Sequence, residues 1–181
     1  MADWINELRL VVEAEYHARR VIATLATVDT EGNPRARTVI VRRIDKDSGA
    51  ISITADRRSN KVAHLAAHPA AELVFWMFNE RLQFRLLGNV ELVRQGAVRD
   101  DMWRELNDSG RAMFLWPPPG EPRRADAVFP DKLATDKPAP PSFVLLVLRP
   151  WEVESLELNE TPHRRRCWRK AKDWNVELLN P

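Results

Sequence analysis

The stretch VIATLATVDTEGNPRARTVIVRRI, residues 21–44, contains two runs rich in β-branched residues on either side of the cluster DTEGNP. Valine, isoleucine and threonine favour strands, and a short Asp, Gly, Asn and Pro segment between two such runs is typical of a hairpin. A second turn, DKDSG, leads to another apolar run, AISIT. Three successive strands with little space for helices between them predict an antiparallel meander rather than a doubly wound sheet.

Further strand-like runs follow along the chain: AELVFWMF, LQFRLLGNVELV, SFVLLVLRPWEVESLEL and, at the end, KDWNVELLNP. Apolar residues that recur every three or four positions predict a helix over residues 1–19, and we expect another around 97–106. Most of the thirteen prolines fall between Trp116 and Pro150, which indicates an ordered loop over 116–141. The predicted fold class is mainly β, a closed antiparallel barrel in one domain over 1–181, because closure removes exposed sheet edges.

Composition restricts the function classes. The formal net charge of +2 over 181 residues gives no overall cationic excess, so we expect no nucleic-acid partner. No apolar run reaches membrane-spanning length and the first twenty residues mix acids with bases, which predicts a cytoplasmic protein without membrane association. The single cysteine, Cys167, allows neither an intramolecular disulfide nor a cysteine metal cage. His64 and His68 are spaced like a metal pair, but without a third ligand we interpret them as helix-surface residues and predict no metal.

Basic residues gather where the third strand gives way to a helix, in DRRSNKVAHL, residues 56–65. Ser59 is a good N-cap residue, the apolar residues after it have helical spacing, and Pro69 ends the pattern. The first N–H groups of a helix have no intrahelical partner and carry partial positive charge, so an anion bound there gains hydrogen bonds and a favourable field. Lys61 would complete a phosphate site. A solvated basic turn is the alternative.

The strand RTVIVRR adds two more cations, Arg37 and Arg42. Their positions have opposite parity, so the two side chains leave opposite faces of the strand unless a bulge redirects one of them. One of the two is expected near the same anion.

The order RTVIVR, AISITADRRSNK, a helix ending in HP, AELVFW, ERLQFRLLG, WPPPGEPR and TPHRRR resembles the pyridoxamine 5′-phosphate oxidase-like family, which binds flavin mononucleotide (FMN) in a split β-barrel. The chain looks closest to FMN-binding relatives that carry a WPxPGxPR segment. The resemblance extends from about Val21 to Pro181. It implies FMN as the cofactor and an obligate homodimer with FMN at the subunit interface.

The resemblance also implies the cofactor-binding residues. The strand from Arg37 to Arg42 would line the flavin with its backbone, and Arg37 would lie near the phosphate. Ser59 and Lys61 would hold the phosphate, whereas Gln83 and Arg165 would come largely from the partner chain. The complete implied set is Arg37, Thr38, Val39, Ile40, Val41, Arg42, Ile53, Thr54, Ser59, Asn60, Lys61, Gln83 and Arg165.

This sequence departs from the family pattern at several positions. Arg42 replaces a lysine and Asn60 an arginine, which changes the hydrogen-bond geometry at one position and removes a cation at the other. In TPH, residues 161–163, the substrate-contacting arginine of the family is absent and the histidine is retained. His163 is therefore the candidate catalytic residue, with a plain surface role as the alternative. Leu156 replaces a tryptophan of the family pattern. These losses argue against oxidation of pyridoxamine 5′-phosphate, the activity that gives the family its name.

Three functions follow from these features. The first is an FMN-dependent oxidoreductase acting on a small-molecule substrate, whose pocket the WPPPGEPR loop would roof. The second is a flavin-binding protein without turnover, used for sensing, storage or assembly, since related split barrels also bind haem or deazaflavin. The third is an interaction module that uses HRRRCWRK, which is the weakest because eight residues with one aromatic give little basis for nucleic-acid binding.

Overall fold

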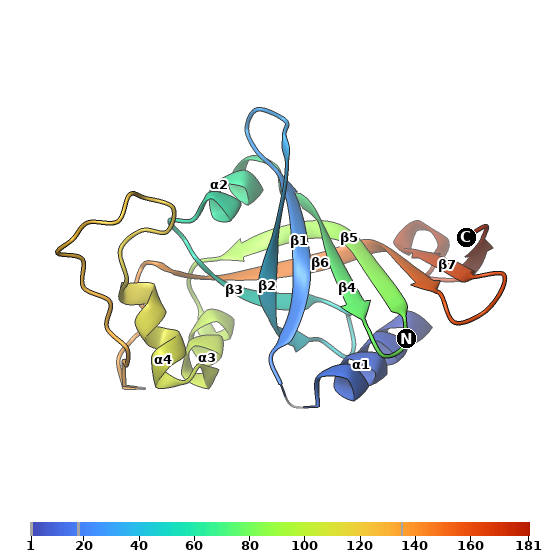
Figure 1. Cartoon of the computed structure of the whole chain (residues 1–181), viewed down its shortest axis with the longest axis horizontal. Coiled ribbons are helices and arrows are strands. Elements are labelled where there is room, and N and C mark those ends of the chain that lie inside the picture. The colour runs from blue at the N-terminus through green and yellow to red at the C-terminus, as the bar shows by residue number, and fades with distance from the viewer. Residues whose placement is uncertain (1, 18, 135) are drawn as a thin grey trace.

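The computed structural model describes residues 2–17, 19–134 and 136–181, and the strands within them form one antiparallel sheet. The strand order is β3-β2-β1-β4-β5-β6-β7-β8, and an additional pairing of β3 with β6 closes the first six strands into a barrel (Figure 1). The strands are β1 (Val21–Val28), β2 (Pro34–Ile44), β3 (Ile51–Asp56), β4 (Ala70–Met77), β5 (Leu82–Val93), β6 (Phe143–Glu157), β7 (Arg164–Arg169) and β8 (Val176–Leu179).

The barrel splits along β6, which is 15 residues long. The first half of β6 pairs with β3, the second half pairs with β7, and β5 follows the other edge of both halves. The β5–β6 register shifts between Leu87 and Gly88, where a Cβ on Gly88 would lie 2.4 Å from the carbonyl oxygen of Arg149. Only glycine permits so close a backbone approach, and such a bulge bends the strand. This irregularity lets β6 leave the barrel and join β7 and β8.

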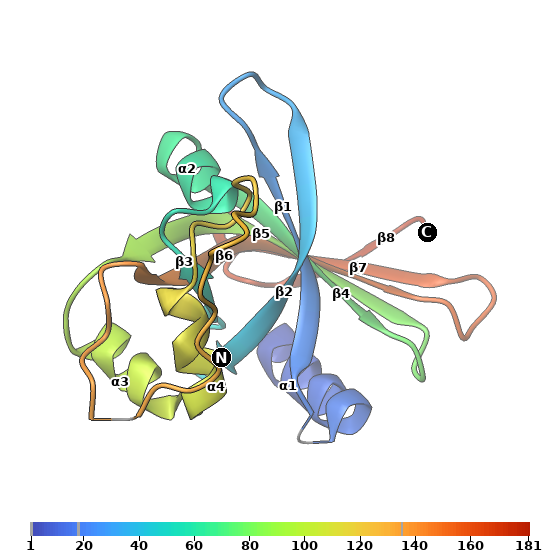
Figure 2. The same cartoon turned by 60° about the vertical axis from the view of Figure 1, so that its left-hand side comes forward.

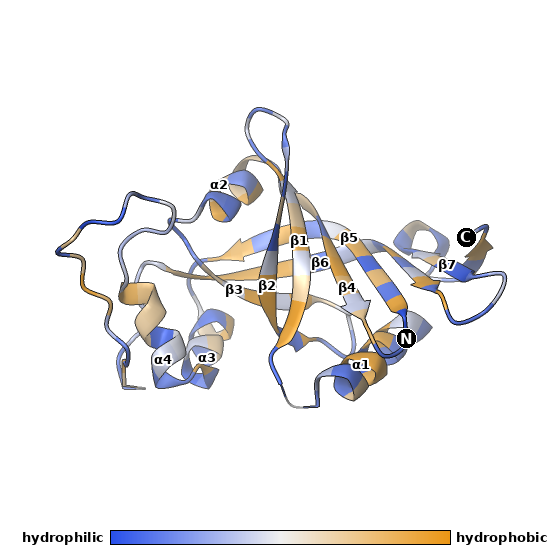
Figure 3. Cartoon of the chain, viewed as in Figure 1, coloured by the Kyte–Doolittle hydropathy of each residue, from blue (hydrophilic) through white to orange (hydrophobic). Residues whose placement is uncertain are grey.

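Alternating burial along the strands builds the barrel core. In β4 and β5 every second side chain is buried, and the colours of β5 alternate accordingly in Figure 3. The inward set includes Leu73, Phe75 and Leu86, all fully buried. Helix α1 (Asp3–Tyr16) adds Trp4 and Leu8 to the same core. The period of two in the sequence therefore corresponds to one buried face.

A second, smaller core lies under helices α3 (Ala97–Glu105) and α4 (Asp108–Ala112), which a short 3₁₀ turn η1 (Met113–Leu115) follows. Trp103 and Phe114 pack edge-on against Phe143, with ring centroids 5.1 and 4.9 Å from it. Strand β6 is covered on both faces, because its odd residues from Phe143 to Val147 contact this core and its even residues contact the barrel core. The remaining helices are α2 (Asn60–Ala67) and η2 (Lys170–Lys172).

The predicted fold class, a closed antiparallel barrel, is confirmed, with three corrections. The first helix ends at Tyr16 and not at residue 19, because His17 adopts a left-handed φ of 41°; residue 18 lies outside the described residues. The predicted helix over 97–106 ends one residue earlier. Helix α4 and strand β7 were not predicted, since α4 contains Gly110 and HRRRCWRK looks like a charge cluster rather than a strand.

The described residues of 116–141, where a loop was predicted, form neither helix nor strand. None of the helices described is long and apolar enough to span a membrane.

Candidate functional site

Arg37 on β2 and Ser59 and Lys61 at the start of α2 form a cluster that we call the cradle. Ser59 occupies the N-cap position, with an extended backbone at φ −77° and ψ 149°, and it is 6% exposed. Its hydroxyl donates to the carbonyl oxygen of Asp56 at 2.6 Å and accepts from Lys61 Nζ at 3.0 Å. The Ser59 side chain does not cap the helix. In the described part of the chain, Val62 N donates to the carbonyl oxygen of Ser59 at 2.9 Å, which leaves the N–H groups of Asn60 and Lys61 for another acceptor.

The described residues compensate the charge of the cradle only in part: the charge of Asp56 favours the charged form of Lys61, but Asp56 forms its ion pair with Arg58. Arg37 Nη1 donates to the carbonyl oxygen of Leu25 at 3.0 Å and to Thr27 Oγ1 at 2.8 Å, and neither group is charged. Burial lowers the pKa of Lys61, and the charge of Arg37 lowers the pKa of Lys61 further. Burial likewise lowers the pKa of Arg37. Among the described residues neither cation forms an ion pair, so the cluster provides the electrostatics of an anion-binding site.

Two residues behind the cradle, Thr27 and His64, were missed as site residues. Thr27 is 3% exposed, and its Oγ1 lies 3.1 Å from His64 Nδ1. The interpretation of His64 as a helix-surface residue was wrong, because this ring is half-buried against β1, whereas His68 is exposed as expected. A signal was present in the sequence: Thr27 continues the inward-facing series of Ala23 and Leu25. A polar side chain at a core position needs a partner.

The outer faces of β2 and β3 carry a second group of the predicted residues. Arg42 Nε donates to Thr54 Oγ1 at 3.2 Å, and burial, followed by the charge of Arg20, lowers the pKa of Arg42. The β2–β3 register shifts between Val41 and Arg43, so Arg42 lies at a bulge. Arg37 and Arg42 contact different groups, in agreement with the prediction from their parity.

Other predicted residues of this strand pair divide by face. Thr38 is exposed, Ile40 is half-buried, and Asn60 is exposed at the start of α2. Val39, Val41 and Ile53 point into the barrel core and are 7%, 6% and 2% exposed. These three residues can offer a ligand only their backbone groups.

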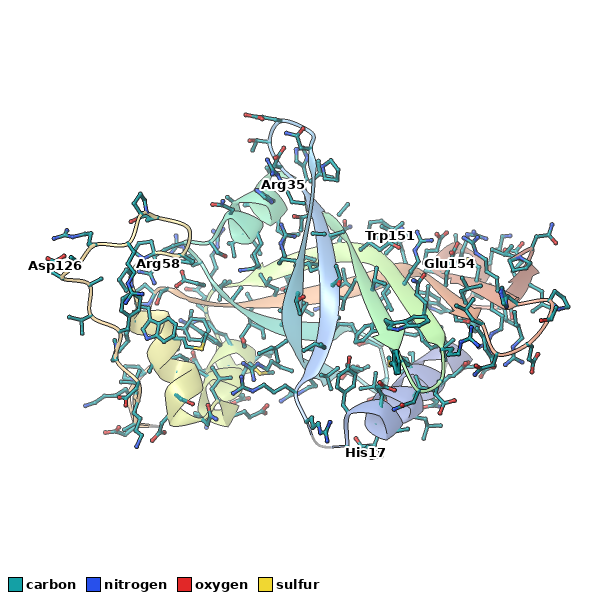
Figure 4. The ribbon with its side chains drawn as sticks, in the orientation of Figure 1. His17, Arg35, Arg58, Asp126, Trp151 and Glu154 are labelled. Carbon is teal, nitrogen blue, oxygen red and sulfur yellow. The ribbon has the colours of Figure 1, made fainter. Side chains whose placement is uncertain are left out.

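Gln83 and Arg165 lie elsewhere in the molecule. Both are paired with Leu156, so they form one row across β5, β6 and β7. Figures 1 and 2 show β7 and α2 on opposite sides of the barrel. Arg165 Nη2 donates to Glu154 Oε2 at 2.7 Å, and Figure 4 shows Glu154 at the β7 end. One chain therefore does not bring Gln83 and Arg165 to the cradle.

His163 is exposed in the connection between β6 and β7, and its Nδ1 lies 2.9 Å from the carbonyl oxygen of Glu160. The arginines that follow it share one feature, which is that each is paired with a glutamate. The pairs are Arg164–Glu157, Arg165–Glu154, Arg166–Glu7 and Arg169 with both Glu152 and Glu177. The HRRRCWRK segment is thus electrostatically compensated, unlike the cradle.

Glu152, Glu154 and Cys167 place their ligand atoms within 4.8 Å of one another, a spacing that suits a metal ion. Both carboxylates accept hydrogen bonds from arginines, however, and Cys167 is 1% exposed. Burial raises the pKa of the Cys167 thiol, which disfavours the thiolate that metals bind. We interpret this cluster as part of the ion-pair network of β6 and β7.

A cavity of about 600 Å³ lies between α1 and the neighbouring ends of β1 and β2. It is lined by Asn6, Arg9, Leu10, Val12, Glu13, Val21, Val41, Arg42, Arg43 and Ile44. Arg42 connects this cavity with the outer face of β2 and β3.

The proline-rich loop begins beside the β3–α2 turn. Arg58 Nη2 donates to the carbonyl oxygen of Trp116 at 2.7 Å and pairs with Asp56 (Figure 4). Trp116 Nε1 donates to the carbonyl oxygen of Pro130 at 2.8 Å, which fixes the loop on itself. The start of the WPPPGEPR segment is therefore tied to the turn that carries the cradle, and its role as the roof of a substrate pocket stays a prediction.

The structure is a split barrel with a cluster of cations beside a helix start, and comparisons with known proteins identify its family. Residues 1–94 match the family model described as "Pyridoxamine 5'-phosphate oxidase, FMN-binding domain". A pyridoxamine 5′-phosphate oxidase-related, FMN-binding protein from Nostoc punctiforme superimposes with a TM-score of 0.90 at 30% identity, covering 100% of this chain and 99% of that one. The chain belongs to this family.

Two further matches agree. Pyridoxine/pyridoxamine 5′-phosphate oxidase 2 from Arabidopsis thaliana is 28% identical over 100% of this chain and 98% of its own length. The structure of PhzG from Burkholderia lata, in complex with tetrahydrophenazine-1-carboxylic acid, has a TM-score of 0.76 at 21% identity, over 100% of this chain and 94% of that one. The second similarity supports the fold alone.

Proposed function

We propose that this protein is an FMN-dependent oxidoreductase and that the cradle holds the phosphate of FMN. One observation carries the proposal: Arg37 and Lys61 form no ion pair among the described residues and lie beside the unpartnered N–H groups of Asn60 and Lys61, in a chain of an FMN-binding family. A phosphate supplies the missing negative charge and several acceptor oxygens. Arg37, the Lys61 ammonium and the backbone N–H groups of Asn60 and Lys61 are the donors for it, while the Ser59 hydroxyl holds the ammonium in place.

The outer face of β2 and β3 is the place for the flavin ring. Thr38, Ile40 and Thr54 line this face with small side chains, and Arg42 lies at its edge. FMN, when bound, supplies a ring that accepts a hydride from a reduced substrate. Arg42 would orient the ring or the substrate with its guanidinium, and the adjoining cavity of about 600 Å³ has the size of a small-molecule site.

We further propose that two copies of the chain build each site. Gln83 and Arg165 share one row across β5, β6 and β7, and β7 lies across the barrel from α2 (Figure 1), so we expect them to reach the flavin only from a second copy. Trp76, which pairs with Gln83, is 42% exposed, and Phe78 is 73% exposed. Apolar side chains of this size beside the proposed site residues are typical of a surface that a partner covers.

Flavin binding without turnover is the second candidate function. The feature that favours it is the TPH segment, where Thr161 occupies the position of the substrate-binding arginine and the exposed His163 contacts the Glu160 carbonyl oxygen. The cradle serves both functions equally. Reduction of the bound flavin by one member of a panel of amines, alcohols or nicotinamide cofactors, followed by absorbance, would favour the enzyme over the binding protein.

The phosphate assignment is tested by comparing FMN with riboflavin, which lacks the phosphate. We expect Lys61→Met to weaken FMN about ten- to a hundred-fold, as loss of a charged hydrogen bond does, and to leave riboflavin affinity unchanged. Lys46→Met, at an exposed lysine in the β2–β3 turn, is the matched control. Equal losses for the two flavins would contradict the assignment.

The two-chain site is tested by mixing variants. Lys61→Met and Arg165→Met each damage both sites of their own homodimer. In a mixed dimer one site combines the intact cradle with the intact Arg165, so a one-to-one mixture that has exchanged subunits should regain about a quarter of the FMN sites. If mixing restores nothing after exchange is verified, Arg165 does not act across an interface.

A further inference from the structure

We propose that His64 is a positioning residue, which holds Arg37 toward the flavin phosphate by way of Thr27. The inference rests on the proposed function, because it assigns a role within the same cradle. It concerns two residues that do not touch the ligand themselves.

The direction of the hydrogen bonds follows from what each group can donate. A guanidinium only donates, so Arg37 Nη1 occupies a lone pair of Thr27 Oγ1 at 2.8 Å. The Thr27 hydroxyl hydrogen must then point to another acceptor. His64 Nδ1 lies 3.1 Å away, and the carbonyl oxygen of Arg35 lies 3.5 Å away. The shorter contact gives the chain Arg37 to Thr27 to His64, with the imidazole hydrogen on Nε2.

Because Thr27 is buried, no other group readily replaces His64 as the acceptor of its hydroxyl hydrogen. Thr27 is 3% exposed, so water cannot readily take over as its acceptor. Without His64 the hydroxyl hydrogen turns to the distant Arg35 carbonyl oxygen, and the lone pair that receives Arg37 turns with it. Since a buried, unsatisfied hydroxyl is costly, the effect reaches the guanidinium.

Arg37 depends on this support because no carboxylate of the described residues holds it. The Leu25 carbonyl oxygen and Thr27 Oγ1 are its hydrogen-bond partners. Losing the second leaves the guanidinium with a single fixed contact, so it must be ordered again when phosphate binds. The expected consequence is weaker binding of FMN and unchanged binding of riboflavin.

The experiment measures FMN and riboflavin affinity by flavin fluorescence in full-length variants. His64→Leu removes the acceptor, whereas His64→Asn places Oδ1 where Nδ1 stood and should restore it. We expect His64→Leu to lose about ten-fold in FMN affinity and His64→Asn to stay near the original protein. His68→Leu, at the exposed histidine after the same helix, is the matched control.

A second variant guards against simple misfolding of the first. Thr27→Val keeps the volume but removes the hydroxyl, and it should reproduce the His64→Leu loss. The double variant should lose no more FMN affinity than either single variant, because both changes break the same series of hydrogen bonds. Additive losses would overturn the proposal, as would an unchanged FMN affinity in His64→Leu, an equal loss for riboflavin, or an asparagine variant that behaves like the leucine one. Failure of the proposed function looks different, because the unchanged protein would then show no preference for FMN over riboflavin.

Discussion

The cradle and the outer face of β7 are both rich in cations, yet they differ in compensation. Arg37 and Lys61 lie beside a helix N-terminus with neutral partners. On β7, Arg165 and Arg169 each contact a glutamate of β6 at 2.7 and 2.6 Å. The cations available to an anion are therefore those without a carboxylate partner, whatever the number of arginines nearby. HRRRCWRK has more cations than the cradle, yet fewer of them are available to bind an anion.

The physical reason lies in the pairing of the strands. Antiparallel β6 and β7 place Glu154 directly opposite Cys167, which is two residues from Arg165 along β7, so carboxylates and guanidinium groups meet on one face. Cross-strand pairs of opposite charge stabilise a sheet modestly. At the cradle, by contrast, β2 meets the start of a helix, where the chain supplies donors on both sides. A cluster of donors and positive charges without a matching acceptor is typical of a functional site.

The largest expected effect comes from supplying the missing charge. Asn60→Asp puts a carboxylate at the first residue of α2, next to Lys61. We expect FMN affinity to fall at least about ten-fold, because the carboxylate competes with phosphate, while the free protein gains roughly 0.5 kcal/mol from the helix terminus. Flavin fluorescence and urea unfolding measure the two changes.

Asn180→Asp, at an exposed position near the carboxyl end, is the control for added charge alone. An Asn60→Asp protein that binds FMN as tightly as before would show that the cradle is not the phosphate site. If Asn60→Asp weakens FMN binding but raises the free energy of unfolding, the cradle differs from the ion pairs of β7 in the way proposed.

A smaller effect is expected from breaking a compensated pair. Glu154 accepts from Arg165 and Arg85 and its side chain is 15% exposed, so Glu154→Gln should lower the free energy of unfolding by about 1 kcal/mol. Glu91 is 53% exposed and pairs with Arg149 alone, so Glu91→Gln should cost no more than about 0.3 kcal/mol. Urea unfolding at pH 7 measures the two variants. Equal losses in the free energy of unfolding would argue against a cooperative network of ion pairs on β6 and β7.

The smallest expected effect concerns the β1–β2 turn. The Asp29 carboxylate accepts from the backbone N–H of Asn33 at 2.9 Å and from Arg35 Nε at 2.8 Å, which together hold the pKa of Asp29 well below its usual range. A lowered folded-state pKa means that the contribution to stability is complete above about pH 4, the unfolded value, and is lost as the pH falls toward the folded value.

Asp29→Asn should therefore lower the urea midpoint at pH 7 and reduce the difference between the midpoints at pH 5 and pH 3. Asp47→Asn, at an exposed aspartate in the next turn, is the control. If the asparagine variant keeps the full acid dependence of the original protein, Asp29 is not its source.

Most of the fold was predictable because the barrel strands have a clear period. The runs AISIT and LQFRLLGNVELV became β3 and β5, since alternating apolar residues favour one buried face. Ser59 was predicted as the start of a helix from capping chemistry and occupies that position. Strand β7 was missed because HRRRCWRK has little apolar pattern, and its pairing with β6 and β8, the burial of Cys167 and Trp168 and its glutamate partners are contacts with distant segments.

The candidate site was predictable only in part. The resemblance grouped Arg37 with Ser59 and Lys61, and in the structure the charge of Arg37 acts on Lys61. It also adds Thr27 and His64, which are 37 residues apart and meet because α2 packs against β1. Gln83 and Arg165, assigned to the FMN site by resemblance, lie in the row that crosses β5, β6 and β7, and β7 is across the barrel from α2 (Figure 1).

The sequence predicted every strand except β7, the helix start at Ser59 and the resemblance to an FMN-binding family, because these depend on local period, capping and residue order. The tertiary structure alone decided which cations are compensated. Compensation depends on contacts between strands far apart in the chain, such as Arg165 with Glu154, and on the absence of such a contact for Lys61 among the described residues. Charge is a property of the residue, whereas its availability to a ligand is a property of the fold.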